Sequence, residues 1–292
     1  MLINSLVLGI DLGTSGVRIA VINKKKNILF TSSTQYPRGL EEWEDWIICC
    51  KKLFTEIPKE MKERLISCAV AGTSGTLLAC KCNGEPLGKA LPYYLSLPEY
   101  SEQINKLFIK DCPGSSTSGS VGRALRLISL YGNKILLIHQ ADWISGWILN
   151  NWELGEEGNN IRMGWDISTS SWPKTFTNLK WLNCLPKIVA SGHIMGKISY
   201  KKANELKLPK NLVIIAGTTD SNAGVLATYP KKSDGVTILG STIVIKKFVK
   251  KPLLGKGISN HKLLGNWLCG GASNAGAAIL LDFFDLEYIE EL

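Results

Sequence analysis

Two aspartates, Asp11 and Asp220, each follow an apolar run and stand among glycine and hydroxyl residues. A carboxylate at the end of a strand can hold Mg²⁺, usually through water, because this ion gives up its hydration shell reluctantly. A second carboxylate in the same cleft can accept the proton of an attacking hydroxyl group. The two aspartates therefore predict phosphoryl transfer to an alcohol, with Asp11 at the metal and Asp220 as general base. The alternative for Asp220 is a helix cap, which is common at a strand-to-helix junction.

The segment around Asp11 has the pattern of a β-hairpin closed by a polar turn. Its aliphatic and β-branched residues predict strands over 6–10 and 17–22. Glycines let the turn bend and approach a ligand closely, and its hydroxyls and amides can bond phosphate or sugar oxygens. The turn residues with these properties are Gly13, Thr14, Ser15 and Gly16. An ordinary hairpin is the alternative, whereas a Walker loop or a dinucleotide fingerprint is excluded because a strand follows the turn.

Two further turns of the same kind follow other predicted strands. Gly72–Thr76 comes directly after the predicted strand 66–71, at the carboxyl end where open α/β sheets bind ligands. A plain turn is the alternative there. Residues 240–242, Gly-Ser-Thr, join two predicted strands between Gly235 and Val249. Two similar hairpins so far apart suggest a duplicated fold that grips phosphates between its halves.

Length and composition exclude several classes of protein. The 292 residues are enough for two domains, or for one with a large insertion. With 45% hydrophobic and 20% charged residues, the sequence is typical of a globular protein rather than a disordered one. No apolar run approaches the roughly 18 residues of a membrane span. Asp11 and Arg18 interrupt the apolar start, so a signal peptide is not predicted and a cytoplasmic location is expected.

The charge and the cysteines argue against nucleic-acid binding and against a metal centre. The net charge is +9, but the lysines occur in short groups rather than in one patch with interleaved aromatics. A basic surface that attracts anionic nucleotides is the better interpretation. The eight cysteines lack Cys-x-x-Cys spacing, so buried or incidental free thiols are expected instead of metal ligands.

The elements around the first two turns predict the opening of a ribonuclease H-like unit. A third strand is expected over 27–34, a helix with regularly spaced apolar residues over 41–56, and a second helix running to about Leu65. Three strands, a helix and a fourth strand are the start of such an α/β unit. An insertion is expected over about 77–210, with helices at 121–131 and 139–146.

Aromatic and glycine-rich segments fill the rest of the sequence. Tryptophans concentrated in 150–172, with Trp181 beyond them, are suited either to sugar contacts or to a core. After the strand that begins at Leu212, Ser221 is predicted to cap a helix. Another strand is predicted over 263–269. The glycine-rich segment that follows it, 270–279, is expected to allow close approach at the start of a helix.

Taken together, five glycine-rich motifs resemble those of the FGGY carbohydrate kinases, in the same order and along nearly the whole sequence. The sequence is most similar to the D-ribulose kinases of plants and cyanobacteria, with further likeness at Asp142–Gly146 and 159–166. The resemblance implies a ribonuclease H-like α/β fold, as in actin, Hsp70 and sugar kinases, with duplicated domains of which the second is incomplete. The five motifs are Gly9–Arg18, Gly72–Thr76, Ala216–Ser221, Leu239–Thr242 and Gly270–Gly276.

The resemblance also implies an activity and a set of site residues. The expected reaction is transfer of the γ-phosphate of ATP, with Mg²⁺, to a hydroxyl of a pentulose, D-ribulose above all, with Asp220 as catalytic base. Asp11 is the expected metal ligand. The residues expected at the substrate are Asp11, Ser15, Gly16, Val17, Arg18, Thr73 and Ser74. Those expected at the nucleotide are Gly13, Thr14, Gly240, Ser241, Thr242 and Gly276.

The same resemblance sets the expected domains and the alternatives. A sugar-binding domain is expected over 1–230, with the start of a nucleotide-binding domain over 231–292. Tyr93–Pro98 departs from the Tyr-Asn-Asp-Ala-Arg-like segment of relatives, which leaves the sugar open. Relatives continue to a glycine-rich adenosine motif that is missing here, so a part of a longer kinase or a truncated gene product is expected. The alternatives are an inactive remnant that binds sugar only and an actin- or Hsp70-like ATPase.

Overall fold

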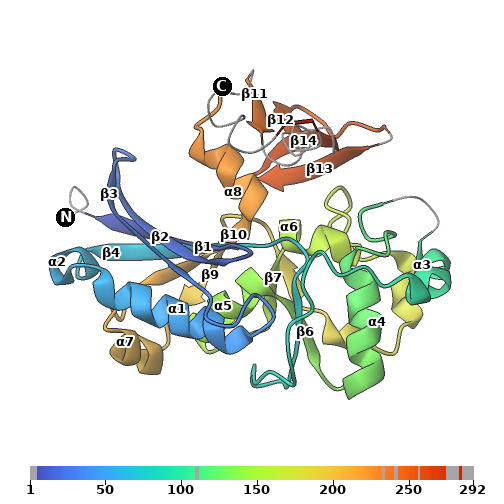
Figure 1. Ribbon diagram of the computed structural model, residues 1–292, viewed down its shortest axis with the longest axis horizontal. Helices are drawn as coiled ribbons and strands as arrows, with labels where there is room; N and C mark the ends of the chain where they lie inside the picture. The colour runs from blue at the N-terminus through green and yellow to red at the C-terminus, as the bar shows by residue number, and fades with distance from the viewer. Residues whose placement is uncertain are drawn as a thin grey trace. The chain divides into compact units, whose positions relative to one another are not determined.

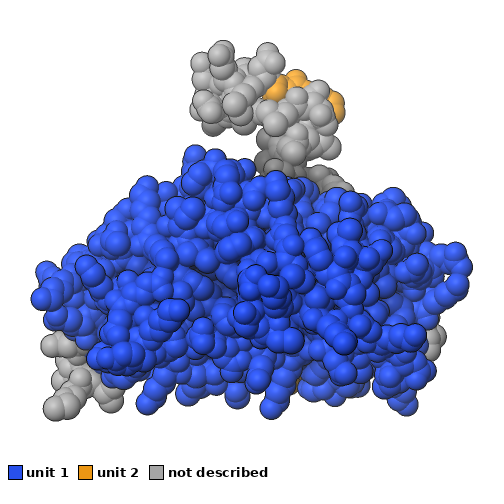
Figure 2. Space-filling view, turned by 90° about the horizontal axis from the view of Figure 1, so that it is seen from below, with its two compact units in different colours: residues 1–220 blue, residues 221–292 orange. Residues whose placement is uncertain are grey.

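The chain divides into two compact units, residues 1–220 and residues 221–292, which Figure 2 colours separately. The structure is a computed structural model that describes residues 5–108, 112–231, 234–239, 243–255, 257–273 and 283–284. The division falls between Asp220 and Ser221, earlier than the domain boundary predicted at 230. Each unit contains its own sheet.

The first unit is built on a six-stranded sheet in the order β3-β2-β1-β4-β10-β9 (Figure 1). The three central strands β1, β4 and β10 run parallel, and the outer strands pair antiparallel to their neighbours. The strands are β1 (Leu6–Leu12), β2 (Gly16–Asn23), β3 (Ile28–Gln35), β4 (Leu65–Gly72), β9 (Ile194–Lys197) and β10 (Val213–Thr219). The hairpin and the third and fourth strands predicted from the sequence are therefore confirmed.

Two helices pack against this sheet, α1 (Trp43–Glu56) and α5 (Gln140–Leu149), and α7 (Tyr200–Leu206) packs against α1 and adds Ala203 and Leu206 to the same core. Alternate residues of β1, from Leu6 to Leu12, are buried in the same core as Trp46 and Trp143. These two indole rings meet edge to face with centroids 6.0 Å apart, an arrangement that aromatic rings favour. The apolar spacing predicted over 41–56 thus brings α1 onto the sheet.

Two predictions near α1 differ from the structure. The second helix, α2 (Lys59–Lys62), is shorter than expected, because β4 begins at Leu65 and Arg64 already bonds to the sheet through its carbonyl. The predicted insertion, about 77–210, also takes in β9 and α7. β9 forms an edge of the main sheet and α7 packs against α1, so both belong to the main layer rather than to an inserted segment.

A second core lies within the remaining part of the first unit. It contains Phe176 and Trp181, with Trp172 stacked on Phe176 at a centroid distance of 6.0 Å, so the tryptophans serve packing there. The predicted helices at 121–131 and 139–146 are confirmed as α4 and α5. The other elements are β5 (Leu77–Cys80), α3 (Ser101–Leu107), α4 (Ser120–Tyr131), β6 (Leu136–His139), β7 (Leu154–Glu156), α6 (Glu157–Asn160) and β8 (Lys187–Val189), with 3₁₀ turns η1 (Pro98–Tyr100), η2 (Ile161–Met163), η3 (Lys174–Asn178) and η4 (Leu182–Cys184).

The second unit contains a four-stranded antiparallel sheet in the order β11-β12-β14-β13. The single strand predicted over 263–269 is wrong, because the chain turns there. Leu264 and Gly265 have φ values of 49° and 81°, the left-handed conformation of a tight hairpin turn. The elements are α8 (Asp220–Ala227), β11 (Gly235–Leu239), β12 (Ile243–Val249), β13 (Ile258–Leu263) and β14 (Asn266–Ser273).

Two further predictions concern the start of α8 and the cysteines. Ser221 does not cap α8, because the helix already begins at Asp220 and the Ser221 hydroxyl accepts a hydrogen bond from Lys246 at 2.8 Å. All eight cysteines are free, and six of them are buried, as expected for free thiols. Among the described residues, none of the helices has the length and apolar character needed to cross a membrane.

Candidate active site

The carboxyl edge of the central strands gathers the main predicted residues of the first unit. Ala71 of β4 pairs with Asp11 of β1 on one side and with Thr218 of β10 on the other. Asp220 follows β10 immediately and is exposed, and Asp11 is partly exposed. Because β1 and β10 are separated only by β4, their ends lie about 10 Å apart. Both carboxylates therefore stand at the same edge of one sheet.

The first loop is ordered by a bond within the turn and by a contact with a distant segment. The amide of Gly13 donates to the carbonyl of Gly16 at 2.9 Å, which closes the turn. The hydroxyls of Thr14 and Tyr93 lie 3.2 Å apart, so the segment that departs from the family pattern contacts this loop. Ser15 is exposed. The loop thus presents amides and hydroxyls to solvent, as a phosphate- or sugar-binding turn requires.

The two residues that follow Ser15 are placed by packing. A Cβ atom on Gly16 would come within 2.2 Å of the carbonyl oxygen of Thr34, so close approach of β3 explains this glycine. The Val17 side chain is buried in the core, which leaves only its backbone for any ligand contact. Arg18 lies beside Asp11 across the hairpin, with Nη1 3.2 Å from Oδ2, and both side chains are substantially exposed.

Hydrogen bonds to buried side chains hold the second glycine turn, Gly72–Thr76, in place. Buried Thr73 has its hydroxyl 2.8 Å from the Gln140 Oε1 atom and 2.7 Å from the hydroxyl of Thr76. These contacts fix the turn and leave the partly exposed Ser74 as the hydroxyl closest to solvent. Gly75 has a φ of 101°, a conformation that favours glycine. Thr73 is therefore placed to support the turn, and Ser74 to meet a ligand.

Two arginines behind this turn were missed by the sequence analysis. A Cβ atom on Gly75 would lie 3.0 Å from Arg123 Nη2 and 3.3 Å from Arg162 Cδ. Burial lowers the pKa of Arg162, and the nearby charges of Asp220 and Tyr93 raise it in part. Burial and the charge of Arg162 lower the pKa of Arg123 to about 10. Arg162 is thus a partly buried cation whose charge interacts with that of the predicted base.

Arg123 has a structural role that its contacts make clear. Its guanidinium is fully buried and donates to the carbonyls of Leu95 at 2.7 Å and Ser118 at 3.1 Å. These bonds tie the segment after Tyr93 to the start of α4. No sequence motif marked either arginine, because each lies far along the chain from the turn that it reaches.

A buried acidic pair supports the segment that carries Arg162. The Asp142 Oδ1 atom accepts from the amide of Glu156 at 3.0 Å, and Glu156 Oε2 accepts from the amide of Asn159 at 2.9 Å. Burial raises the pKa of Asp142 to about 7. Burial, with the nearby charge of Asp142, raises the pKa of Glu156 well above its ordinary value. These bonds fix α6 and, directly after it, the turn η2 with Arg162.

The donor set at Asp11 fits a weakly held Mg²⁺ ion. Among the described residues, no group of three or more His, Cys, Asp or Glu side chains could hold a metal ion. Asp11 is partly exposed, and among the described residues its ion-pair partner is Arg18. Mg²⁺ commonly binds in this way, with one or two carboxylates and with water and nucleotide phosphates as the other ligands.

Part of the predicted nucleotide site lies outside the described residues. This applies to Gly240, Ser241, Thr242 and Gly276. Within the described part of the second unit, the buried Lys246 reaches the first turn of α8. Its Nζ atom donates to Ser221 Oγ at 2.8 Å and to Asn222 Oδ1 at 2.5 Å. Lys246 was not predicted, because the sequence shows it as one of many lysines.

Comparison with solved structures identifies the fold. The chain matches a xylulose kinase from Lactobacillus acidophilus with a TM-score of 0.82 and 14% identity, over 99% of this chain and 64% of that one. It matches a xylulose kinase from Rhodospirillum rubrum with a TM-score of 0.83 and 15% identity, over 94% and 62%. It matches a Plasmodium falciparum glycerol kinase structure with ADP with a TM-score of 0.78 and 14% identity, over 95% of this chain and 63% of that one.

These matches define the class of fold. The chain has the ribonuclease H-like α/β fold of sugar kinases, and it spans less than two thirds of the length of these structures. No known family profile matches the sequence. The likeness to solved structures thus establishes the predicted fold class, and the roles of the individual site residues stay predictions.

Proposed function

We propose that the protein is an FGGY carbohydrate kinase that transfers the γ-phosphoryl group of ATP to a hydroxyl of a pentulose, with D-ribulose as the favoured substrate. The observation that carries the proposal is Asp220, an exposed carboxylate directly after β10 and at the same sheet edge as the Asp11 loop. Its charge interacts with that of Arg162. The sugar-kinase fold and the five ordered motifs support it. The choice of D-ribulose rests on the resemblance to that subgroup.

In the proposed reaction, the oxygen of the sugar hydroxyl bonds to the γ-phosphorus, and Asp220 accepts the proton of that hydroxyl. The bond from that phosphorus to the bridging oxygen breaks, and ADP leaves. Phosphoryl transfer depends mainly on positioning and on stabilising the charge of the phosphoryl oxygens. Arg162 provides a cation beside the base, and Mg²⁺, held with Asp11, supplies charge neutralisation at the phosphates when bound.

The lining at the sheet edge fits a neutral sugar. Ser15 and Ser74 offer hydroxyls that are at least partly exposed, and Tyr93 places its hydroxyl against Thr14. Such groups both donate and accept hydrogen bonds, as the hydroxyls of a sugar do. A site of this kind discriminates against a sugar that cannot form all of these hydrogen bonds, because some polar groups of the site then stay unpaired.

A coupled assay of ADP release with D-ribulose, D-xylulose, L-ribulose and glycerol tests the proposal. We expect turnover with a pentulose, and D-ribulose to be the best of the four. Asp220→Ala is expected to lower turnover by about 10²- to 10⁴-fold, the usual contribution of a general base. Glu60→Ala, at an exposed position on α2, is the control and should retain activity.

The other outcomes separate the alternatives. Sugar binding measured by calorimetry without any ADP release would point to an inactive remnant. ATP hydrolysis that is indifferent to every sugar would point to an ATPase of the actin or Hsp70 type. Equal turnover by the parent protein and Asp220→Ala, both folded by circular dichroism, would refute Asp220 as the base.

A further inference from the structure

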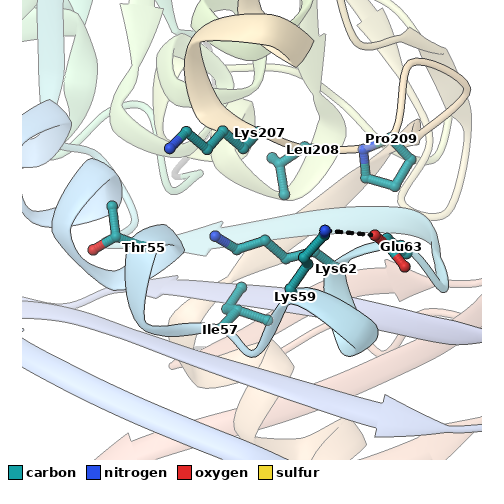
Figure 3. Close-up of a pocket in the computed structure, with 8 residues that line it drawn as sticks. All are labelled: Thr55, Ile57, Lys59, Lys62, Glu63, Lys207, Leu208 and Pro209. Atoms are coloured by element: carbon teal, nitrogen blue, oxygen red, sulfur yellow. Dashed lines mark ion pairs between the residues drawn. The ribbon is translucent and has the colours of Figure 1, made fainter.

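A lysine-lined pocket of about 550 Å³ lies in the first unit, away from the candidate active site (Figure 3). One wall comes from the end of α1 and from α2, and the other from the segment after α7. The residues that line it are Thr55, Ile57, Lys59, Lys62, Glu63, Lys207, Leu208 and Pro209. Figure 3 shows the Lys62 and Lys207 side chains extending from opposite walls toward the side where Thr55 lies.

The pocket lies at the opposite edge of the sheet from the candidate active site. Its two walls directly precede β4, which begins at Leu65, and β10, which begins at Val213. These strands run parallel, and their other ends lead to Gly72–Thr76 and to Asp220. A ligand in this pocket therefore binds at the amino ends of the strands whose carboxyl ends form the proposed active site.

The charges that line the pocket are unbalanced. Three lysines face one carboxylate, Glu63, which lies 3.9 Å from Lys59. Among the described residues, neither Lys62 nor Lys207 forms an ion pair, whereas Lys51 and Lys202 on neighbouring helices both pair with Glu205. Partial burial, with the nearby ammonium of Lys207, lowers the pKa of Lys62. The fold thus brings two like charges together, an unfavourable arrangement that a bound anion would relieve.

The other lining residues indicate the chemical class of the anion. Ile57 and Leu208 are almost fully buried and, with Pro209, provide an apolar wall next to the ammonium groups. Among the described residues, lysines and no arginine line the pocket. Arginine binds planar carboxylates through two parallel hydrogen bonds, whereas the ammonium group of lysine acts as a point charge that suits a phosphate. The pocket therefore combines a site for a phosphate group with a surface for a carbon skeleton.

We propose that this pocket binds a small phosphorylated metabolite, with Lys62 and Lys207 at the phosphate and with Ile57 and Leu208 at the carbon skeleton. The proposal does not depend on the kinase activity, because its residues and its position are separate from those of the candidate active site.

Labelling with pyridoxal 5′-phosphate tests this site in the intact chain. The probe carries a phosphate and an aldehyde that condenses with a neutral lysine amine, releasing water, and borohydride reduces the imine to a stable amine. Peptide mass spectrometry then gives the labelling rate of each lysine. With Lys207 pairing with the probe's phosphate, we expect the Lys62 amine to react with the aldehyde at least about fivefold faster than the exposed Lys134, since an ion pair at a partly exposed site contributes up to about 1 kcal/mol.

Three comparisons separate phosphate binding from simple reactivity. Pyridoxal, which lacks the phosphate, should show a clearly smaller preference for Lys62, only the part that its lowered pKa produces. Inorganic pyrophosphate should protect Lys62, and sodium chloride at equal ionic strength should not. Lys207→Met should slow the phosphate-dependent labelling by about fivefold. Lys207→Asn is a second variant, suited to the left-handed backbone at this position, where φ is 54°.

The outcomes that would overturn the proposal are equally specific. Equal labelling of Lys62 by pyridoxal and by its phosphate would refute an anion site. Equal protection by citrate and pyrophosphate would refute the preference for phosphate. Lys134→Met serves as the matched control and should leave the labelling of Lys62 unchanged, with the thermal unfolding midpoint of each variant showing that it is folded.

Discussion

Arg162 shows how a single residue can change the character of the candidate site. It lies beside the glycine turn at Gly75 and close enough to Asp220 for the two charges to interact. Its burial disfavours its positive charge, and the nearby carboxylate offsets this only in part. Such a partly desolvated cation is costly for folding and useful for binding, a combination often found at functional sites.

Replacing this cation should separate activity from stability. We expect Arg162→Met to lower sugar-dependent turnover by about 10- to 100-fold, because a preorganised charge beside the reacting groups is lost. The thermal unfolding midpoint should stay the same or rise, since the variant no longer buries a charge. Turnover and the midpoint are measured on the same samples. Arg126→Met, on the exposed face of α4, is the control, and equal losses in both variants would contradict the role of Arg162.

The buried Asp142 predicts a pH dependence of stability. Its pKa is about 7 in the folded protein, against an ordinary value of 3.8. Between these values the folded protein keeps a proton that the unfolded chain has released, so the free energy of unfolding falls as pH rises. The slope is about 1.4 kcal/mol per pH unit for one proton, and it ends once the pH exceeds the folded pKa.

Asp142→Asn replaces the titrating carboxyl by an amide that does not titrate. The free energy of unfolding of the variant should therefore fall less steeply than that of the parent protein between about pH 4 and pH 7. Urea unfolding at several pH values gives both curves. The oxygen of the new amide can still accept from the amide of Glu156, which keeps the local structure. Parallel curves for the two proteins would show that Asp142 titrates normally in the folded state.

At the scale of elements, a close contact between β10 and β4 sets the approach to Asp220. The pairing of these strands shifts in register between Ala216 and Thr218, so Gly217 is the extra residue of a bulge. A Cβ atom there would lie 1.9 Å from the carbonyl oxygen of Val70. Bulges of this type redirect the residues that follow them, and here the residues that follow lead to Asp220.

Two glycines of the first hairpin give a matched test of such backbone contacts. Gly16→Ala should destabilise the protein by about 1–3 kcal/mol, because the methyl group would overlap the backbone of Thr34 and Gln35. Gly9→Ala, in the adjacent strand β1, should be tolerated, since a Cβ atom there would lie 3.9 Å from the carbonyl oxygen of Ala20, an ordinary van der Waals contact. Chemical denaturation measures both variants. Similar losses of stability in the two would contradict the contact as the cause.

On the scale of the whole molecule, the two units have very different cores. Among the described residues, the buried cluster of the second unit contains only Val225, Leu263 and Leu268. The first unit has two larger clusters, one on the main sheet and one in the segment beyond it. Because burial of apolar surface is the main source of stability, the two units should differ in their resistance to opening.

Native-state hydrogen exchange followed by mass spectrometry tests this difference. We expect backbone amides in peptides from β12 and β14 to exchange at least about tenfold faster than those from β1 and β4, since each 1.4 kcal/mol of opening free energy changes the rate tenfold. Uniform protection across both units would show that they open together. Addition of the proposed sugar should further protect peptides around Gly72–Thr76 if the sugar binds there.

Local pattern determined much of this protein. Short aliphatic and β-branched runs predicted the first hairpin and β4, and helical spacing predicted α1 and α4. The ends of the predicted strands indicated Asp11 and Asp220. These features were predictable because each depends on neighbours within a few residues along the chain. The turn at Leu264 and Gly265 was missed because apolar residues on both sides of it give the appearance of one continuous strand.

Only the tertiary structure decided which residues meet at the site. It placed Arg162 beside Asp220, turned the Thr73 hydroxyl toward Gln140, and brought Lys62 and Lys207 into one pocket. In each case the two partners lie far apart in the sequence and are joined by the order of strands in the sheet. The types and spacing of residues carry no information on such contacts, because strand order and helix packing determine them.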